Sequence, residues 1–471
     1  MDKERRKKIQ TTKLIITEIF MLLIIVLTVV ILTFIVMGYH LNEDGKLEQS
    51  GLVQVDSFPT GATVTIDDEV LPNETNTSKI LPEGDHNIQL KKEGYTSWSK
   101  TVTLHSGFLT KLSYPHLYKE NPKTEVVTEF KEKPLLFLPS KNRNLGLLKY
   151  PGGQLTTLNL ESKSPKETTI NLSEIIKNST IEDLDAAKIT DWSNSGERII
   201  LSTKTGFFII DLEHPEYSLD LSAEFDIKIS DLHFLNDQGD RLGVLENNNF
   251  RTISLSDKKL SDILAKNVLS FSNSGSKVVL IAKKPEESKK IILYDISSKS
   301  EIFLADSLAE NTQAFISEYA GRFTLVFISD NVVTVRRGDL PTENITKENP
   351  LSEPIGKYTL DFGTPKDFDF RGKNQLVVTS SGNNIAVFDL ENYKLTTYSV
   401  EADLTFWVSE YTIGTVSGGK LVLRDFDNTN SVTFKDAESD FQAVITKDNS
   451  YLYYISKDNS ENLNLVRDLI K

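Results

Sequence analysis

The residues best suited to inorganic chemistry lie close together near the end of this 471-residue chain, at Asp425, Asp427, Asn428, Thr429 and Asn430. Carboxylate and amide oxygens at such short spacing are the ligands that calcium takes in protein loops. The run lacks the loop glycine and the distal glutamate of a calcium loop, and a hairpin turn rich in Asp and Asn has the same composition. Asp425 and Asp427 are therefore candidate metal ligands, and a turn is the alternative.

Covalent catalysis finds no support in the spacing of nucleophiles and bases. Ser-x-x-Lys occurs at Ser97–Lys100 and Ser274–Lys277, but neither copy has the companion motifs of the enzymes that use it. The sequence contains no Gly-x-Ser-x-Gly, His-Glu-x-x-His, Gly-x-Gly-x-x-Gly or phosphate-loop motif. The six histidines are His40, His86, His105, His116, His214 and His233. No two of them have the spacing that would place them as metal ligands on one face of a helix or strand. We therefore predict no catalytic residues, no cofactor and no enzyme.

The composition limits the compartment and the partners. The chain has no cysteine, which excludes disulfides, thiolate metal sites and anchoring through a lipidated cysteine. Its 53 basic and 67 acidic residues give a net charge of −14. We expect no nucleic-acid partner, because phosphate binding needs clustered Lys and Arg.

One apolar segment, Leu14 to Met37, is long enough to cross a membrane. About 24 residues rising about 1.5 Å each give a helix of roughly 36 Å, against a hydrocarbon core of about 30 Å. Basic side chains gather before the segment, so the positive-inside rule places residues 1–13 in the cytoplasm and the later residues outside. We predict a transmembrane helix over 14–39 and a linker over 40–50.

A cleaved signal peptide is the alternative interpretation of this segment. Its apolar part would be about 7–15 residues long and would end at a small-residue cleavage site. Here the run is longer, and after Met37 no alanine occurs until Ala62. We therefore favour an uncleaved signal-anchor and a single-pass protein of the cell membrane.

Residues 51–116 alternate between apolar and polar side chains in short stretches separated by turns that contain glycine. Alternation with a period of two is typical of half-buried antiparallel strands. The predicted strands are 52–57, 62–67, 86–91, 100–104 and 108–114. Glycine at the turns supplies the positive φ that a tight reversal requires.

These residues resemble the PEGA domain. From Val53 to Asp67 the pattern is V-x-V-x-S-x-P-x-G-A-x-V-x-I-D, and from Leu81 to Tyr95 it is L-P-x-G-x-H-x-I-x-L-x-K-x-G-Y, followed by Trp98, Val102 and Leu104. After Asp67 the family has a short path to a Thr-Pro pair, whereas residues 68–79 here are polar and irregular. The resemblance implies a small β-sandwich of a surface or envelope protein and no catalytic activity.

From about Phe137 onward the chain repeats a strand that ends in Asp or another small polar residue followed by an apolar one. The copies include 156–160, 208–212, 251–255, 293–296, 387–390 and 423–426. Their spacing centres near about 42 residues, which is the period of a four-stranded propeller blade.

A second pattern precedes each copy by about twenty residues: an aromatic residue, a reversal rich in Ser, Asn and Gly, and another apolar strand. The clearest copies are 192–200 and 271–279, and looser ones are 234–242 and 370–377. These patterns resemble the repeat of TolB-like and WD40-like propellers, although the Gly-His and Trp-Asp signatures of WD40 repeats are absent. We predict a propeller over 135–471 with eight blades, or seven.

The same analysis assigns the remaining segments. The charged stretch 117–134 is predicted to connect the two domains. Segments 161–184 and 338–364 are predicted insertions, with one helical turn at Leu172–Ile176. Aromatic residues recur at one phase of the repeat, at Trp192, Phe234, Phe271 and Phe315. We expect their side chains to pack between blades and not to form a ligand cage.

The predicted fold is therefore all-β with one N-terminal transmembrane helix. We expect an extracytoplasmic binding or scaffold protein of the cell envelope, held by Leu14–Met37, whose propeller presents an interaction surface to an envelope polymer or a partner protein. One alternative is a propeller-type hydrolase or lyase with a polar central funnel, which His214 or His233 beside two carboxylates in that funnel would favour. The other is an assembly or sensor subunit that acts through the helix carrying Glu18.

Overall fold

The computed structural model divides the chain into two compact units, residues 1–120 and 121–471. The described residues are 2–36, 38–41, 45, 47–176, 181–283, 288–307, 309–319, 321–346, 356–371 and 375–471. Met37, at the predicted end of the membrane segment, lies outside them.

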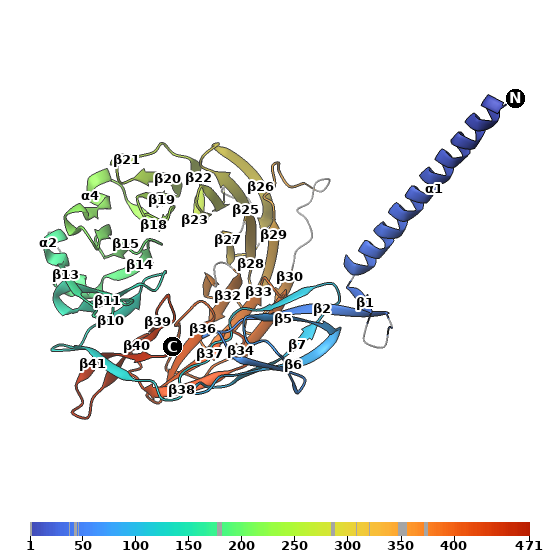
Figure 1. Cartoon of the computed structure of the whole chain (residues 1–471). Coiled ribbons are helices and arrows are strands. Elements are labelled where there is room, and N and C mark those ends of the chain that lie inside the picture. The colour runs from blue at the N-terminus through green and yellow to red at the C-terminus, as the bar shows by residue number, and fades with distance from the viewer. Residues whose placement is uncertain are drawn as a thin grey trace. The chain divides into compact units, whose positions relative to one another are not determined.

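One long helix, α1 (Asp2–Val36), opens the first unit (Figure 1). Its stretch Lys13–Ile35 has a mean hydropathy of 3.0, and its most apolar 18-residue window is not buried at all. Thr17, Thr28 and Thr33 donate to carbonyls four residues earlier at 2.8–2.9 Å, so these hydroxyls are satisfied inside the helix. The helix is long and apolar enough to span a membrane, and a signal sequence meets the same test.

Two small sheets form the rest of the first unit. One contains β1 (Tyr39–Leu41), β2 (Leu47–Val55) and β5 (Thr77–Pro82), with β8 (Leu109–Leu112) parallel to β2. The other has the order β4 (Glu69–Val70), β3 (Thr63–Ile66), β6 (Gly84–Lys91) and β7 (Trp98–Leu104). One face of the predicted strands carries the core, and Val53, Val64, Ile88, Leu90 and Leu104 on it are fully buried.

Two stretches of this unit differ from the prediction. Residues 68–79, expected to be irregular, contain β4 and the start of β5. The strand β5 forms because its backbone pairs with β2 from Val55↔Thr77 to Ser50↔Pro82, and its own sequence carries little apolar alternation. The predicted linker 40–50 likewise contains most of β1 and the start of β2, which pair with each other.

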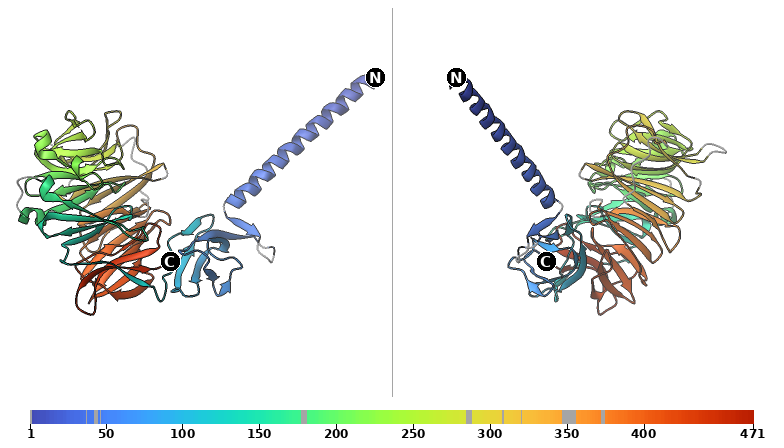
Figure 2. Two further views of the ribbon diagram at one scale, coloured as in Figure 1. Left: turned by 60° about the vertical axis from the view of Figure 1, so that its left-hand side comes forward. Right: turned by 90° about the vertical axis from the view of Figure 1, so that its right-hand side faces the viewer.

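The second unit is a β-propeller (Figures 1 and 2). Within its described residues, eight antiparallel sheets of four strands follow one another around a ring, and β22 adds a fifth strand to the third. In chain order, the first three sheets are sheet 1, with β10 (Leu136–Pro139), β11 (Leu145–Tyr150), β12 (Gln154–Asn159) and β13 (Glu167–Asn171); sheet 2, with β14 (Lys188–Trp192), β15 (Arg198–Ser202), β16 (Phe207–Asp211) and β17 (Leu219–Asp220); and sheet 3, with β18 (Ile229–Phe234), β19 (Arg241–Glu246), β20 (Asn249–Ser254), β21 (Lys259–Leu260) and β22 (Ala265–Lys266). The next three are sheet 4, with β23 (Val268–Ser274), β24 (Lys277–Ala282), β25 (Lys289–Asp295) and β26 (Ser300–Ser307); sheet 5, with β27 (Thr312–Tyr319), β28 (Arg322–Ser329), β29 (Val332–Gly338) and β30 (Gly356–Thr359); and sheet 6, with β31 (Asp367–Arg371), β32 (Leu376–Ser381), β33 (Asn384–Asp389) and β34 (Lys394–Ser399). The last two are sheet 7, with β35 (Leu404–Trp407), β36 (Thr412–Ser417), β37 (Lys420–Asp425) and β38 (Ser431–Asp436), and sheet 8, with β39 (Val444–Ile445), β40 (Tyr451–Lys457), β41 (Leu463–Leu469) and β9 (Thr124–Glu129).

The ring is closed by a strand from its N-terminal side. Although 117–134 is predicted to be a connection, β9 within it pairs with β41 as the outer strand of sheet 8. Arg467 of β41 contacts Glu125 of β9 at 3.0 Å, and Thr124 donates to Asp468 at 2.5 Å. Sheets 8 and 1 also share an apolar cluster that includes Phe137 and the fully buried Tyr453. The pairing was missed because its partners are about 340 residues apart and leave no local pattern.

Apolar contacts between neighbouring sheets explain the recurring aromatic residues. Trp192 lies in a cluster formed by sheets 1 and 2, Phe234 in one formed by sheets 2 and 3, and Phe271 in one formed by sheets 3 and 4. Each of the three is less than one tenth exposed. Phe315 is partly buried and packs against the cluster of sheets 5 and 6.

The predicted insertions contain the outer strands of their sheets. Segment 161–184 contributes β13 and 338–364 contributes β30, so neither is simply an insertion. The helical turn predicted after Asn171 is α2 (Leu172–Ile175). The other short helices among the described residues of this unit are α3 (Ile181–Ala186), α4 (Leu221–Phe225), and the 3₁₀ turns η1 (Pro151–Gly153) and η2 (Pro215–Tyr217).

Candidate functional site

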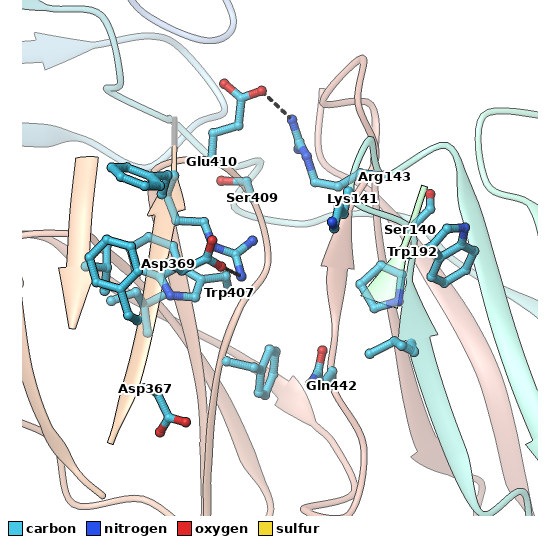
Figure 3. A pocket seen from close by; sticks show the side chains of 18 of the residues that line it. Ser140, Lys141, Arg143, Trp192, Asp367, Asp369, Trp407, Ser409, Glu410 and Gln442 are labelled. Atoms are coloured by element: carbon cyan, nitrogen blue, oxygen red, sulfur yellow. Dashed lines mark ion pairs between the residues drawn. The ribbon is translucent and has the colours of Figure 1, made fainter. Parts of the chain in front are cut away.

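The first strands of four sheets line a cavity of about 1010 Å³ in the second unit (Figure 3). We call it the funnel. Its walls come from β10 and the turn after it in sheet 1, from β14 in sheet 2, from β31 in sheet 6, and from β35 in sheet 7. Gln442, which precedes β39, adds a side chain from sheet 8. These segments are far apart in sequence, and the closing of the ring brings them together.

Most of the charges in the funnel are paired with one another. Arg143 contacts Glu410 at 3.8 Å and so joins sheet 1 to sheet 7 (Figure 3). Arg143 also donates to the carbonyls of Ile445 and Thr446 in sheet 8, at 3.0 and 3.2 Å. Because this guanidinium is satisfied by three partners, it fixes the turn after β10 and leaves little net charge for a ligand.

A second pair stands beside an aromatic ring on the wall of the funnel. Arg371 Nη2 contacts Asp369 at 2.7 Å, and the guanidinium lies over the Trp407 ring at 5.5 Å. Burial by the surrounding walls raises the pKa of Asp369, and the charge of Arg371 opposes that shift. Among the described residues Arg371 Nε and the Thr405 hydroxyl are buried without a hydrogen-bond partner. This wall therefore holds polar atoms whose hydrogen-bonding capacity is unused.

Asp191 connects three sheets at the opposite wall. Its carboxylate accepts from Lys141 of sheet 1 at 2.6 Å, from its neighbour Trp192 N at 2.8 Å, and from Phe234 N of sheet 3 at 3.1 Å. His233 of sheet 3 lies 3.7 Å from the same carboxylate. Burial alone would raise the pKa of Asp191, but His233 and Lys141 outweigh it and lower that pKa to about 2.

His233 stands between two carboxylates, which is the arrangement that would favour an enzyme. Its Nδ1 is 3.7 Å from Asp191 and its Nε2 is 3.3 Å from Asp231. Burial would lower the pKa of His233, but the two carboxylates outweigh it and raise that pKa to about 9. Both carboxylates favour the protonated imidazole, and neither His233 nor Asp231 is among the residues that line the funnel, so this geometry favours an ion-paired structural role. His214 contacts one carboxylate, Glu216, at 3.5 Å.

The candidate metal ligands Asp425 and Asp427 lie in the hairpin between β37 and β38. Asp425 accepts from the Asn430 amide at 2.9 Å, and Asp427 accepts from the Thr429 backbone and hydroxyl at 3.2 and 2.6 Å. Both side chains are buried. In the part of the chain that the structure describes, no group of three or more His, Cys, Asp or Glu residues is arranged to hold a metal. The contacts of this hairpin are those of an Asp/Asn-rich turn.

Comparison with known families assigns the sandwich of the first unit. Residues 50–118 match the PEGA domain. This part of the chain is a PEGA domain. The match includes two residues beyond the predicted end at 116, Leu117 and Tyr118, and both are buried. Tyr118 N donates to the Thr96 hydroxyl at 3.0 Å, and Thr96 N donates to Tyr118 O at 2.8 Å, so these residues continue the domain.

For the propeller, the comparisons give a structural likeness only. One similar solved structure is the C-terminal WD40 domain of Sif2, at 10% sequence identity and a TM-score of 0.44, covering 74% of this chain and 98% of that one. No curated protein matches this chain. The propeller assignment therefore rests on the sheets and their closure.

The sequence did not single out the funnel as a site. Trp192 and the 370–371 pair occur within recognised repeats, but nothing distinguishes them there from structural positions. Arg143, Trp407 and Glu410 lie outside the quoted patterns. Unequal copies of a repeat were the available signal, since Arg143 in the turn of sheet 1 takes the place of Gly196 in sheet 2, each donating from its backbone to the serine three residues earlier.

Proposed function

We propose that this protein is a membrane-anchored extracytoplasmic binding protein, and that its funnel holds an extended polar segment of a partner protein. The observation that carries the proposal is the lining of the funnel: internally paired charges beside an indole and uncharged polar side chains. A PEGA domain next to a propeller supports a surface interaction role. The envelope location and the identity of the partner are part of this proposal.

The size and chemistry of the funnel favour an extended ligand over a compact one. A volume of about 1010 Å³ lies at the upper end of the range for small-molecule sites. Because Arg143, Arg371 and Lys141 are each paired with a carboxylate, a highly charged ligand would gain little Coulomb energy. A polypeptide segment offers one donor and one acceptor per residue, which suits a lining that also holds uncharged polar side chains such as Ser140, Ser409 and Gln442.

An enzymatic role is the second candidate, because His233 lies between two carboxylates in this unit. A general base must have a pKa near the working pH and a free lone pair. The raised pKa of His233, about 9, argues against a general base at neutral pH, and His233 is not among the residues that line the funnel. We therefore favour binding. Hydrolysis of a polymer by the purified protein, lost in His233→Gln, would reverse this preference.

Affinity capture tests the binding proposal. Full-length protein in detergent is used to capture partners from envelope extracts, in parallel with Trp407→Ala and with Tyr217→Ala. Tyr217 is an exposed aromatic outside the funnel lining and serves as the matched control. A partner of the funnel should be retained by Tyr217→Ala and reduced by about tenfold or more in Trp407→Ala, as for a central aromatic contact.

Digestion of the captured material identifies its class. If protease treatment destroys the captured material, the partner is a protein, as proposed. If the captured material survives protease but is destroyed by glycosidase, the partner is an envelope polysaccharide and the proposal of a protein partner is wrong. Equal capture by all three proteins would show that the funnel is not the binding site.

A further inference from the structure

The sheet of the PEGA domain that contains β2 carries an exposed row of apolar side chains. Leu52 of β2 is paired directly with Ile80 of β5 on one side and with Leu109 of β8 on the other. Ile80 is 58% exposed, Leu109 42% and Leu52 37%, and the adjacent Phe108 is 65% exposed. Since Val53 and Val55 fill the core from the other face of β2, this row is the outward face of the sheet.

The next row on the same face is polar. Two residues along each strand, Gln54 is paired with Ser78 and with Lys111. The outward face therefore changes from apolar to polar over one step of the pleat. The apolar row lies at the end of the sheet where β8 begins, two residues from Ser50 along β2. A core-type face would be apolar along its whole length, so this graded face fits a boundary between an apolar and an aqueous medium.

Three backbone hydrogen bonds connect that end of the sheet to α1. Gly38 N donates to the carbonyl of Ile35, the last residue of the apolar span, at 3.0 Å. Ser50 N donates to Gly38 O at 2.8 Å, and Gly107 N donates to Ser50 O at 2.9 Å. Phe108 follows Gly107 directly. The apolar row is thus held next to the residues at which the helix would leave the hydrocarbon.

We propose that Phe108, Leu109, Leu52 and Ile80 form a membrane-docking surface, which inserts into the lipid interface at the C-terminal end of α1. The proposal rests on α1 spanning a membrane and is independent of what the funnel binds. Burial of these side chains among headgroups and upper acyl chains removes apolar area from water, and aromatic rings such as Phe108 and Tyr39 favour that depth. In this proposal the lipid bilayer covers the surface. The alternatives are that a second copy of the chain or the propeller of the same chain covers it.

Site-directed spin labelling of the full chain tests this surface, and the natural absence of cysteine makes single labels clean. Phe108→Cys and Ile80→Cys are labelled with a nitroxide and reconstituted in phosphatidylcholine–phosphatidylglycerol vesicles. Ser78→Cys, on the same strand and face as Ile80 but in the polar row, is the matched control. Collisions with oxygen, which partitions into lipid, are compared with collisions with the water-soluble nickel ethylenediaminediacetate complex.

We expect the oxygen-to-nickel ratio at positions 108 and 80 to be several times that at position 78. A high nickel accessibility at 108 and 80, equal to that at 78, would overturn the proposal because the surface would be in water. Exclusion of both reagents from 108 and 80 would also overturn it, because a protein surface and not lipid would cover the row. Ile80 and Phe108 are exposed, so labelling them should leave the fold intact, and an unchanged circular-dichroism melt of each variant verifies this. A single labelled variant that folds is enough to decide the test.

Discussion

At the scale of single residues, the repeated Asp at the end of the third strand has one recurring function. Its side chain accepts backbone N–H groups of the turn that leads to the fourth strand: Asp211 from His214 at 2.8 Å, Asp295 from Ser297 at 3.0 Å, and Asp389 from Glu391 at 2.8 Å. A short carboxylate that bonds two or three residues ahead is the stereochemistry of an Asx turn. This explains why the repeat was visible in the sequence.

The two sequence patterns also meet across one hairpin. Arg198 and Asp211 are direct partners of β15 and β16 and form an ion pair at 3.0 Å. Lys277 and Asp295 occupy the equivalent places in sheet 4, at 2.7 Å. In both sheets the cation follows the Ser/Asn/Gly reversal and pairs with the Asp at the end of the next strand, 13 residues later in sheet 2 and 18 in sheet 4. The two sequence patterns therefore belong to one structural unit that is repeated with the blade period.

Protonation of His233 should make part of the propeller's stability depend on pH. The pKa of His233 is raised to about 9, so its contribution is fully present below about pH 6.5 and is lost as the pH rises through about 9. Because the imidazole is 41% exposed, we expect only about 1 kcal/mol after allowance for solvent screening. His233→Gln should lower the melting temperature at pH 6 and by less at pH 10.

The control for this measurement is His214→Gln, which alters a more exposed histidine paired with one carboxylate. Its melting temperature should follow that of the wild type at both pH values. A deficit of His233→Gln that is equal at pH 6 and pH 10 would show that the imidazole contributes by packing and not by charge.

At the scale of the elements, Trp192 should stabilise the contact between sheets 1 and 2. The indole is 3% exposed, and its N–H donates to the Gly196 carbonyl at 2.9 Å. Trp192→Ala should therefore cost about 3–5 kcal/mol of folding free energy, as for other large buried aromatics. Denaturant titration followed by circular dichroism measures this loss, with the exposed Tyr217→Ala as control. Unchanged stability together with a lost partner would make Trp192 a binding residue.

Elements with a local pattern were predicted, and elements formed by remote pairing were not. Strands β3 and β6 can be predicted from the sequence because apolar residues, among them the buried Val64, Ile88 and Leu90, recur in them with a period of two. By contrast, β5 is defined by its partner β2, and β9 by β41. The funnel was beyond prediction for the same reason, since Arg143 and Glu410 meet only after the ring has closed.

At the scale of the whole molecule, the basic flank before α1 predicts an orientation that protease accessibility can test. Protease added to intact cells that express the chain should remove the PEGA domain and the propeller, because residues after about 40 are expected outside. A tag at the N-terminus should remain protected until the membrane is permeabilised. Protection of the C-terminal half in intact cells would contradict this orientation.

The pairing of β9 with β41 has a consequence for the order of events during biosynthesis. The closing strand emerges among the first 130 residues, and its partner Leu463–Leu469 emerges more than three hundred residues later. Until β41 has been synthesised, the sheets that have already formed make an open arc whose terminal strands are unpaired. Those edges are templates for wrong partners. The nascent propeller is therefore open to wrong pairing until β41 has been made, and sheet 8 is the last part of the ring to become native.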